Sequence, residues 1–140
     1  MSETPRKTPR PLPRVNVYMN TRPFWDAAKQ GKLLMQFCKD TGKPQFFPRP
    51  VSLATGRRNL EWREVSGRGK VYSWTVTYSA WPGHEDRVPY VCALVELDEG
   101  VRMLANLANC KHEDIRMEMS VKVCWEKLSE DISIPAFEPA

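Results

Sequence analysis

Five strand-like runs follow one another after Gly67, and they restrict the second half of the chain to a small β-fold. These runs span residues 70–79, 89–97, 101–108, 120–127 and 132–137. The first run alternates and places four large side chains on one side: Tyr72, Trp74, Val76 and Tyr78. Asp98-Glu99-Gly100 predicts a tight hairpin between the second and third runs, and residues 112–116 predict one helical turn. Together these features match an OB-fold, although any small five-stranded barrel fits the pattern nearly as well.

The segment before this barrel, residues 21–66, predicts a short helix followed by a small sheet. Thr21 is a candidate cap for the helix, Pro23 is tolerated in its first turn and Gly31 can end it. An alternating strand is expected over residues 32–39 and a second strand over residues 60–65. Residues 1–20 form a basic, proline-rich arm, in which prolines alternate with Arg, Lys and Thr over residues 1–14. This composition favours an extended arm that either docks on a partner or stays loose.

The charge of the 140-residue chain is divided between its two halves. Residues 39–70 carry a net charge of +5, whereas residues 71–140 carry −6. This asymmetry suggests an anionic ligand or partner near the first half, with ordinary solvated faces as the alternative. No apolar run approaches the roughly 20 residues that a membrane span needs, and the N-terminus lacks the apolar core of a secretory signal. Four cysteines without paired spacing indicate reduced thiols, so we expect a cytoplasmic protein.

Several short motifs occur in an order that resembles a known family. They are Pro23-Phe24-Trp25, Phe46-Phe47-Pro48-Arg49-Pro50, the run from Ser66 to Thr75, and Pro89-Tyr90-Val91. The chain resembles the acyl-CoA-associated zinc-ribbon/OB-fold family known as domain of unknown function 35. The resemblance implies a mainly β fold: an N-terminal helical arm and a rubredoxin-like ribbon at 21–66, then a five-stranded OB-fold barrel at 67–140.

The resemblance also implies a zinc site, from which this sequence departs. Such ribbons hold zinc with two Cys-x-x-Cys pairs, and the matching positions here are Cys38, Thr41, Ser52 and Thr55. A protonated hydroxyl is a poor zinc ligand, so one thiolate alone does not form a structural site. We therefore expect a metal-free ribbon with no bound cofactor. A partner interface or apolar packing would replace the metal, and the candidates for packing are Leu33, Phe37, Phe46, Leu53 and Trp62.

For function, the resemblance implies a non-catalytic accessory subunit. Members associate with thiolase-superfamily enzymes, either thiolases or lipid-transfer-protein-like aldolases, and help to form the acyl-CoA site, in pathways that include lipid or sterol side-chain degradation. Phosphates of coenzyme A need clustered bases, and its adenine stacks on aromatic rings. The expected ligand-binding or partner-binding residues are Phe46, Phe47, Arg49, Arg57, Arg58, Arg63, Arg68, Trp81, Arg87 and Tyr90. Because neighbours in extended chain point to opposite faces, one ring of the Phe46-Phe47 pair should face outward.

Parts of the sequence are also compatible with two other functions. Catalysis by this chain alone would use His84 with Glu85 and Asp86, but a histidine on a polar loop is more often simply solvated. It would alternatively use Cys110 with His112, but such a pair needs a third group to orient it. Binding of single-stranded nucleic acid would use the OB-fold and the aromatic side chains of its first strand. The net charge of −6 over the barrel half counts against that second function, because a nucleic-acid site should be basic. We therefore expect neither a nucleic-acid nor a membrane partner.

Overall fold

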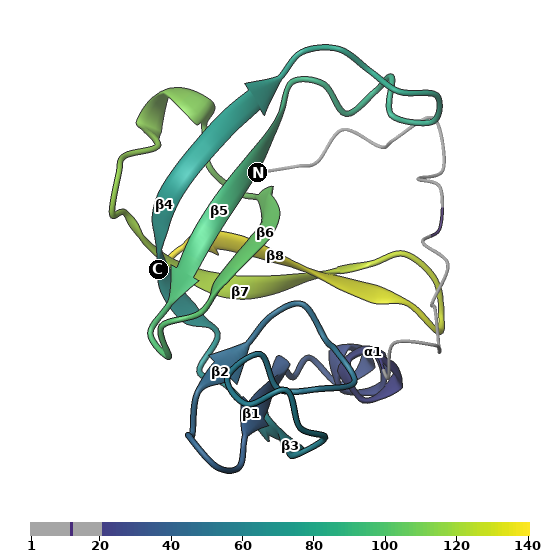
Figure 1. Ribbon diagram of the computed structural model, residues 1–140. Helices are drawn as coiled ribbons and strands as arrows, with labels where there is room; N and C mark the ends of the chain where they lie inside the picture. Colours follow the sequence, from purple (N-terminus) through teal and green to yellow (C-terminus); the bar gives the residue numbers. More distant parts are fainter. Residues whose placement is uncertain (1–11, 13–20) are drawn as a thin grey trace.

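The computed structural model describes residue 12 and residues 21–140, so most of the predicted N-terminal arm lies outside the described residues. In the described part, helix α1 and a three-stranded sheet precede a five-stranded barrel (Figure 1). The elements are α1 (Arg22–Lys29), β1 (Leu34–Cys38), β2 (Pro44–Gln45), β3 (Leu60–Glu64), β4 (Arg68–Thr77), β5 (Tyr90–Leu97), β6 (Arg102–Leu107), the 3₁₀ helix η2 (His112–Asp114), β7 (Ser120–Lys127) and β8 (Ser133–Pro139). No helix of the described residues is long and apolar enough to span a membrane.

Helix α1 begins and ends close to where the sequence predicts. Gly31 adopts a φ of +71°, which glycine reaches without a steric penalty, and the Gly31 amide donates to the Ala28 carbonyl at 3.0 Å. Thr21 precedes the helix but makes no capping hydrogen bond with its side chain, so the predicted cap is not formed. Phe24, Ala27 and Ala28 are the buried side of the helix.

The barrel closes in the order β4-β5-β6-β8-β7, and β7 pairs back onto β4. Numbered within the barrel, this order is 1-2-3-5-4, and the pair β6–β8 is its only parallel ladder among the described strands. The mainly β class, the ribbon followed by an OB-fold and the hairpin at 98–100 are confirmed. The predicted helical turn at 112–116 is the 3₁₀ helix η2.

A β-bulge in β4 overturns the predicted single face of large side chains. The ladder to β5 shifts between Val71 and Ser73, so that Val71 lies opposite Val95 and Trp74 lies opposite Ala93. Val95 and Ala93 are both fully buried, so Trp74 shares the core-facing side of the sheet. Tyr72 sits at the bulge and is 46% exposed. Tyr72 and Trp74 therefore do not form one stacking platform.

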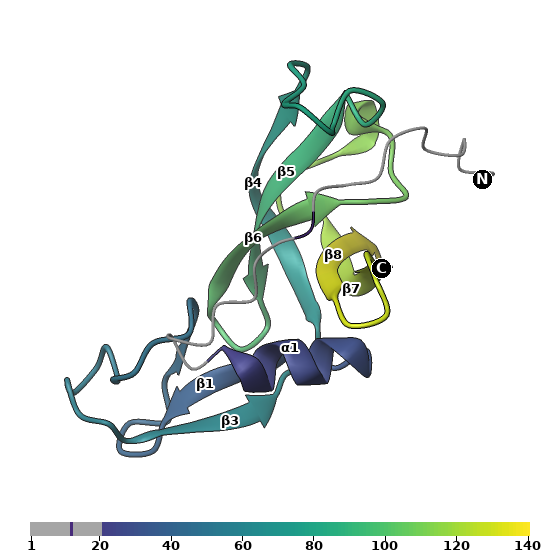
Figure 2. The ribbon, with the colours of Figure 1, turned by 90° about the vertical axis from the view of Figure 1, so that its right-hand side faces the viewer.

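The ribbon and the barrel share one hydrophobic core. Buried side chains of the first part, among them Phe24 and Met35, belong to the same cluster as Val71 and Phe137 of the barrel. Figure 2 shows α1 lying along the ribbon sheet, beneath the strands β7 and β8. Helix α1 contacts both β1 and β8. The ribbon is therefore packed against one end of the barrel.

Candidate functional site

Two tight turns, which we call the first knuckle (residues 38–43) and the second knuckle (residues 52–57), have the same backbone geometry. In the first, the Cys38 amide donates to the Lys43 carbonyl and the Gly42 amide donates to the Cys38 carbonyl. In the second, Ser52 bonds Arg57 and Gly56 bonds Ser52 in the same pattern, at 2.8 Å each. Gly42 and Gly56 both have a φ of +70°. The turns therefore keep one shape although only one of them contains cysteine.

Cys38 is the first residue of the first knuckle and is 1% exposed. Hydrogen bonds from the Ser52 hydroxyl, then from the Thr41 hydroxyl, lower the pKa of Cys38 to about 7. The Ser52 hydroxyl also accepts the Ala54 amide at 3.1 Å, and Thr55 accepts the Arg57 amide at 3.3 Å. The Ser52 and Thr41 hydroxyls thus contact the Cys38 sulfur, whereas the Thr55 hydroxyl serves its own turn.

A pair of buried glutamines, which we call the glutamine clamp, ties the strands of the ribbon to the chain between the knuckles. The Gln36 side chain donates to the Arg49 carbonyl and accepts the Arg49 amide, both at 2.8 Å. Gln45 donates to Gln36 and to the Val51 carbonyl at 3.1 Å, and it accepts the Leu53 amide at 2.9 Å. Gln36 is 3% and Gln45 is 6% exposed. The clamp therefore fixes residues 49–53 over β1 and β2.

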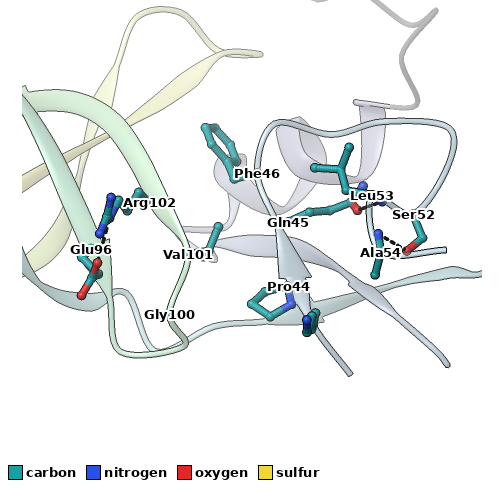
Figure 3. A pocket seen from close by; sticks show the side chains of 11 residues that line it. Pro44, Gln45, Phe46, Ser52, Leu53, Ala54, Glu96, Gly100, Val101 and Arg102 are labelled. Atoms are coloured by element: carbon teal, nitrogen blue, oxygen red, sulfur yellow. Dashed lines mark hydrogen bonds and ion pairs between the residues drawn. The ribbon is translucent and has the colours of Figure 1, made fainter. Parts of the chain in front are cut away.

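An open groove runs between the second knuckle and the β5–β6 hairpin, and we call it the ribbon–barrel groove (Figure 3). Its volume is about 590 Å³. Phe46 points into the groove from the ribbon side, and Arg102 and Glu96 stand on the barrel side. Lys43 and Leu53 also line it, and Leu53 is 64% exposed. The expectation that Leu53 packs in the ribbon core is therefore wrong, because the clamp turns residue 53 toward solvent.

The predicted arginines do not gather in one place. Arg57 and Arg58 are exposed on and beside the second knuckle, and Arg49 is exposed between the knuckles. Arg63 pairs with Glu61 and lies over the Phe37 ring at 4.9 Å. Arg68 is exposed at the start of β4, at the base of the barrel. The structure therefore places three of the predicted arginines at the end of the ribbon.

Residues 78–89 link β4 to β5 and carry three further predicted residues. Trp81 is 76% exposed. Arg87 is held instead by an ion pair with Glu126 of β7 at 3.0 Å, and its side chain is only 11% exposed. Tyr90 begins β5, with the His84 ring 6.5 Å away. In the ribbon, Phe47 is the outward ring of its pair, at 56% exposure, as predicted for one of the two.

Cys110 and His112, one of the pairs considered for catalysis, have other partners than each other. The Cys110 thiol donates to the neighbouring Lys111 carbonyl at 3.3 Å, and burial raises its pKa. His112 instead faces Glu113 at 3.1 Å and the ring of Tyr78. Glu85 accepts the Gly83 amide at 2.9 Å. Within residues 21–140 these groups therefore serve turns and loop ends.

Four residues of the site were not predicted. Lys43 and Arg102 line the groove, and Gln36 and Gln45 build the clamp. The available signal for Arg102 was its place opposite Glu96 across a predicted hairpin, since cross-strand partners of opposite charge face each other. A glutamine in an alternating strand carries no comparable signal, because it resembles an ordinary solvent-facing position.

Comparison with known proteins identifies the family. The family model described as "ChsH2, rubredoxin-like zinc ribbon domain" matches residues 25–52, and that described as "ChsH2, C-terminal OB-fold domain" matches residues 62–126. A DUF35 domain-containing scaffold protein of Pyrococcus furiosus is 33% identical over 112 residues, which cover 80% of this chain and 82% of that protein. The chain belongs to the DUF35 family.

Other relatives of this DUF35 chain are longer than it is. The probable enoyl-CoA hydratase alpha subunit of Thermomonospora curvata is 34% identical over 140 residues, which cover 99% of this chain and 43% of that protein. The 3-oxo-4,17-pregnadiene-20-carboxyl-CoA hydratase alpha subunit of Mycobacterium tuberculosis is 35% identical over 117 residues, 83% of this chain and 36% of that protein. This chain therefore spans less than half the length of either subunit.

A solved structure, titled Ltp2-ChsH2(DUF35) aldolase, is similar in both sequence and shape. A chain of that structure superposes with a TM-score of 0.80 and 32% identity, over 91% of this chain and 98% of the other. The similarity therefore extends over the ribbon and the barrel together.

The zinc that gives the DUF35 ribbon its name does not fit the residues of this chain. Zinc is held by thiolate, imidazole or carboxylate, and the four ligand positions offer one thiol and three hydroxyls. The described part of the chain holds no cluster of three or more His, Cys, Asp or Glu side chains suited to a metal ion. In this chain the two knuckles share one backbone shape, and backbone hydrogen bonds within each turn hold it.

Proposed function

We propose that this chain is the non-catalytic accessory subunit of a thiolase-superfamily enzyme, either a thiolase or a lipid-transfer-protein-like aldolase. One observation carries the proposal: the superposition, over 98% of its length, of a chain from the Ltp2-ChsH2(DUF35) aldolase at 32% identity. The scaffold and alpha-subunit names of the relatives agree with a role in an assembly. In this proposal, the partner supplies the nucleophile and the base, and this chain supplies a docking and ligand-facing surface.

The test is gentle purification of the tagged chain from its native cells, followed by mass spectrometry with stoichiometry. A near-equimolar thiolase-superfamily protein is the expected result. Recovery of the chain alone, or with nucleic acid, would refute the accessory-subunit role. The four free cysteines suit a reducing compartment, and we therefore expect the complex in the cytoplasmic fraction.

A finer part of the proposal is that the end of the ribbon helps to bind acyl-CoA. The exposed bases Arg57 and Arg58 and the groove-lining Lys43 provide the positive charge that the phosphates of coenzyme A require. Phe46 points into the adjoining groove, where an adenine ring finds an aromatic surface. The acyl group is proposed to come from lipid or sterol side-chain degradation, which the pregnadiene-carboxyl-CoA name of one relative supports.

Calorimetric titration of coenzyme A into the reconstituted complex tests this part. The double variant Arg57→Ala/Arg58→Ala should weaken binding by at least about ten-fold, because two charge-assisted contacts are lost. Arg116→Ala is the matched control, since Arg116 lies beside η2 and bonds the Glu113 carbonyl. Equal affinity for the double variant and the wild type would exclude these arginines. A panel of lipid and sterol acyl-CoA substrates would then identify the acyl group.

We further propose that the ribbon keeps its shape without metal, and that the glutamine clamp takes over the cross-linking role of zinc. The clamp joins β1, β2 and residues 49–53 through five hydrogen bonds, with both side chains buried. Elemental analysis of the purified chain should give no stoichiometric zinc. One zinc ion per chain would refute the metal-free ribbon.

A further inference from the structure

The strands β4, β5 and β6 lie side by side and form one outer face of the barrel (Figure 1). Two rows of side chains cross this face: Ser73, Leu94 and Leu104 form one row, and Lys70, Glu96 and Arg102 form the next. Leu104 is 66% exposed, although it lies in the middle of a strand. Such a residue on a flat sheet face is a candidate anchor for a partner protein.

Two members of the charged row, Glu96 and Arg102, neutralise each other within the chain, whereas the third member, Lys70, is exposed. The Arg102 Nε atom donates to Glu96 at 2.8 Å, and the Arg102 guanidinium lies 3.7 Å above the centre of the Tyr72 ring. The guanidinium therefore holds the Tyr72 ring in place by a cation–π contact while its charge is balanced by a carboxylate. A fixed tyrosine and a neutralised arginine lose little conformational freedom when a partner covers them.

The outer face continues into the ribbon–barrel groove. Glu96 and Arg102 belong to both, since they also line the groove. Figure 3 shows them on the barrel side of the groove, with Phe46 and the exposed Leu53 on the ribbon side. The Glu96–Arg102 ion pair thus lies between the exposed Leu104 of the barrel face and the exposed Leu53 of the second knuckle.

We propose that this face, centred on Tyr72 and Leu104 and extended by Leu53, is where the thiolase-superfamily subunit docks. The inference rests on the proposed function and names the surface through which this chain would bind its partner subunit. The surface of the partner should be apolar and poor in charge opposite Leu104, because Glu96 and Arg102 already satisfy each other. The face ends beside the basic residues of the knuckles, so a partner seated on it would bring its bound acyl-CoA toward them.

The same observations disfavour a polyanion on this face. A nucleic-acid site needs unpaired positive charge and aromatic rings in series. Of the two bases in the charged row, Arg102 is already paired with Glu96 and only Lys70 is left, and the bulge in β4 turns Trp74 to the opposite side of the sheet from Tyr72. A protein surface therefore fits the face better than a charged strand does.

The experiment compares variants in binding to the co-purifying thiolase-superfamily subunit, after that subunit has been produced recombinantly. Leu104→Glu introduces an unpaired charge at the centre of the face, and Tyr72→Ala removes the fixed ring. Met117→Glu is the control, because Met117 is 72% exposed in a turn that bonds β4 on the side away from β5. Thermal unfolding of each variant confirms that the fold is intact before the dissociation constant is measured.

Leu104→Glu should raise the dissociation constant by at least about ten-fold and Tyr72→Ala by several-fold, with Met117→Glu within about two-fold of the wild type. Equal binding by all variants would overturn the assignment of this face while leaving the accessory-subunit role intact. Absence of wild-type binding would instead remove the proposed function, and the docking face with it. Self-association of the chain that Leu104→Glu abolishes, or oligonucleotide binding that it weakens, would assign the face to a different occupant and overturn the proposal.

Discussion

Replacing Gln36 by leucine tests whether the glutamine clamp holds the ribbon together. The substitution keeps a side chain of similar size on β1 but removes three hydrogen bonds, of 2.8, 2.8 and 3.1 Å. Each donor or acceptor left without a partner in a buried site costs roughly 1–3 kcal/mol of stability. The Arg49 backbone is only partly buried, so water can replace part of its lost hydrogen bonding. The expected net destabilisation is about 2–4 kcal/mol, a large share of the roughly 5–15 kcal/mol that stabilises a typical domain.

For a chain of this length, that loss corresponds to a fall in Tm of about 7–14 °C, from the typical entropy of unfolding per residue. Differential scanning calorimetry measures it, and Gln30→Leu is the control because Gln30 is an exposed residue at the end of α1. Gln45→Leu should lower the Tm by a similar amount. The double variant should cost less than the two single variants together, because the two amides bond each other at 3.1 Å.

A shift for Gln36→Leu no larger than that for Gln30→Leu would refute the clamp as a substitute for metal. A second refutation is available in the wild-type chain itself. If a zinc chelator lowered its Tm by a comparable amount, a metal rather than the clamp would hold the ribbon.

Three further predictions concern the knuckles, Cys38 and Gly69. Completing the cysteine set with Thr41→Cys, Ser52→Cys and Thr55→Cys should create a site for one zinc ion per chain, because both knuckles already have matching backbone geometry. A colorimetric zinc-release assay measures the bound metal. Failure of the triple variant to bind zinc would show that the two knuckles are not placed to share one ion. The Ser52 hydroxyl holds the pKa of Cys38 at about 7, below its unfolded value near 9, so the chain should gain stability as the pH rises from about 7 to about 9 and lose it as the pH falls through 7. Denaturant titrations across that range should show this dependence in the wild type and not in Cys38→Ala. Gly69→Ala should cost about 2 kcal/mol or more in chemical unfolding, since a Cβ there collides with the backbone of β5, and a neutral result would show that β4 and β5 can separate locally.

Much of the fold could be predicted because short local patterns of residues indicate its strands and turns. The hairpin at 98–100 and the end of α1 at Gly31 depend on short turn signals, and both are confirmed. The bulge in β4 has no such signal. Strict alternation from Tyr72 to Tyr78 predicts one continuous face, whereas the pairing with β5 introduces an extra residue after Val71 and reverses the faces beyond it.

The site was harder to predict than the fold. In β1 the alternation suggests a covered side and an open side, but all four residues from Met35 to Cys38 are buried. The second side is covered by residues 49–53, which come from a segment with no regular pattern. Arg87 is a second contact that local patterns do not predict, since its ion pair with Glu126 joins residues 39 positions apart.

The contact of α1 with β8 determines when, during synthesis of the chain, the packing of the first helix can be completed. Lys29 pairs with Asp131 at 3.1 Å across 102 positions of the chain, and helix α1 packs on the last strand. At roughly 5–20 residues per second, a ribosome needs several seconds to add the residues between them. During that interval the first helix has been made, but the strand β8 on which it packs has not. Helix α1 therefore lacks this contact until β8 has been synthesised, although its contact with β1 is available much earlier.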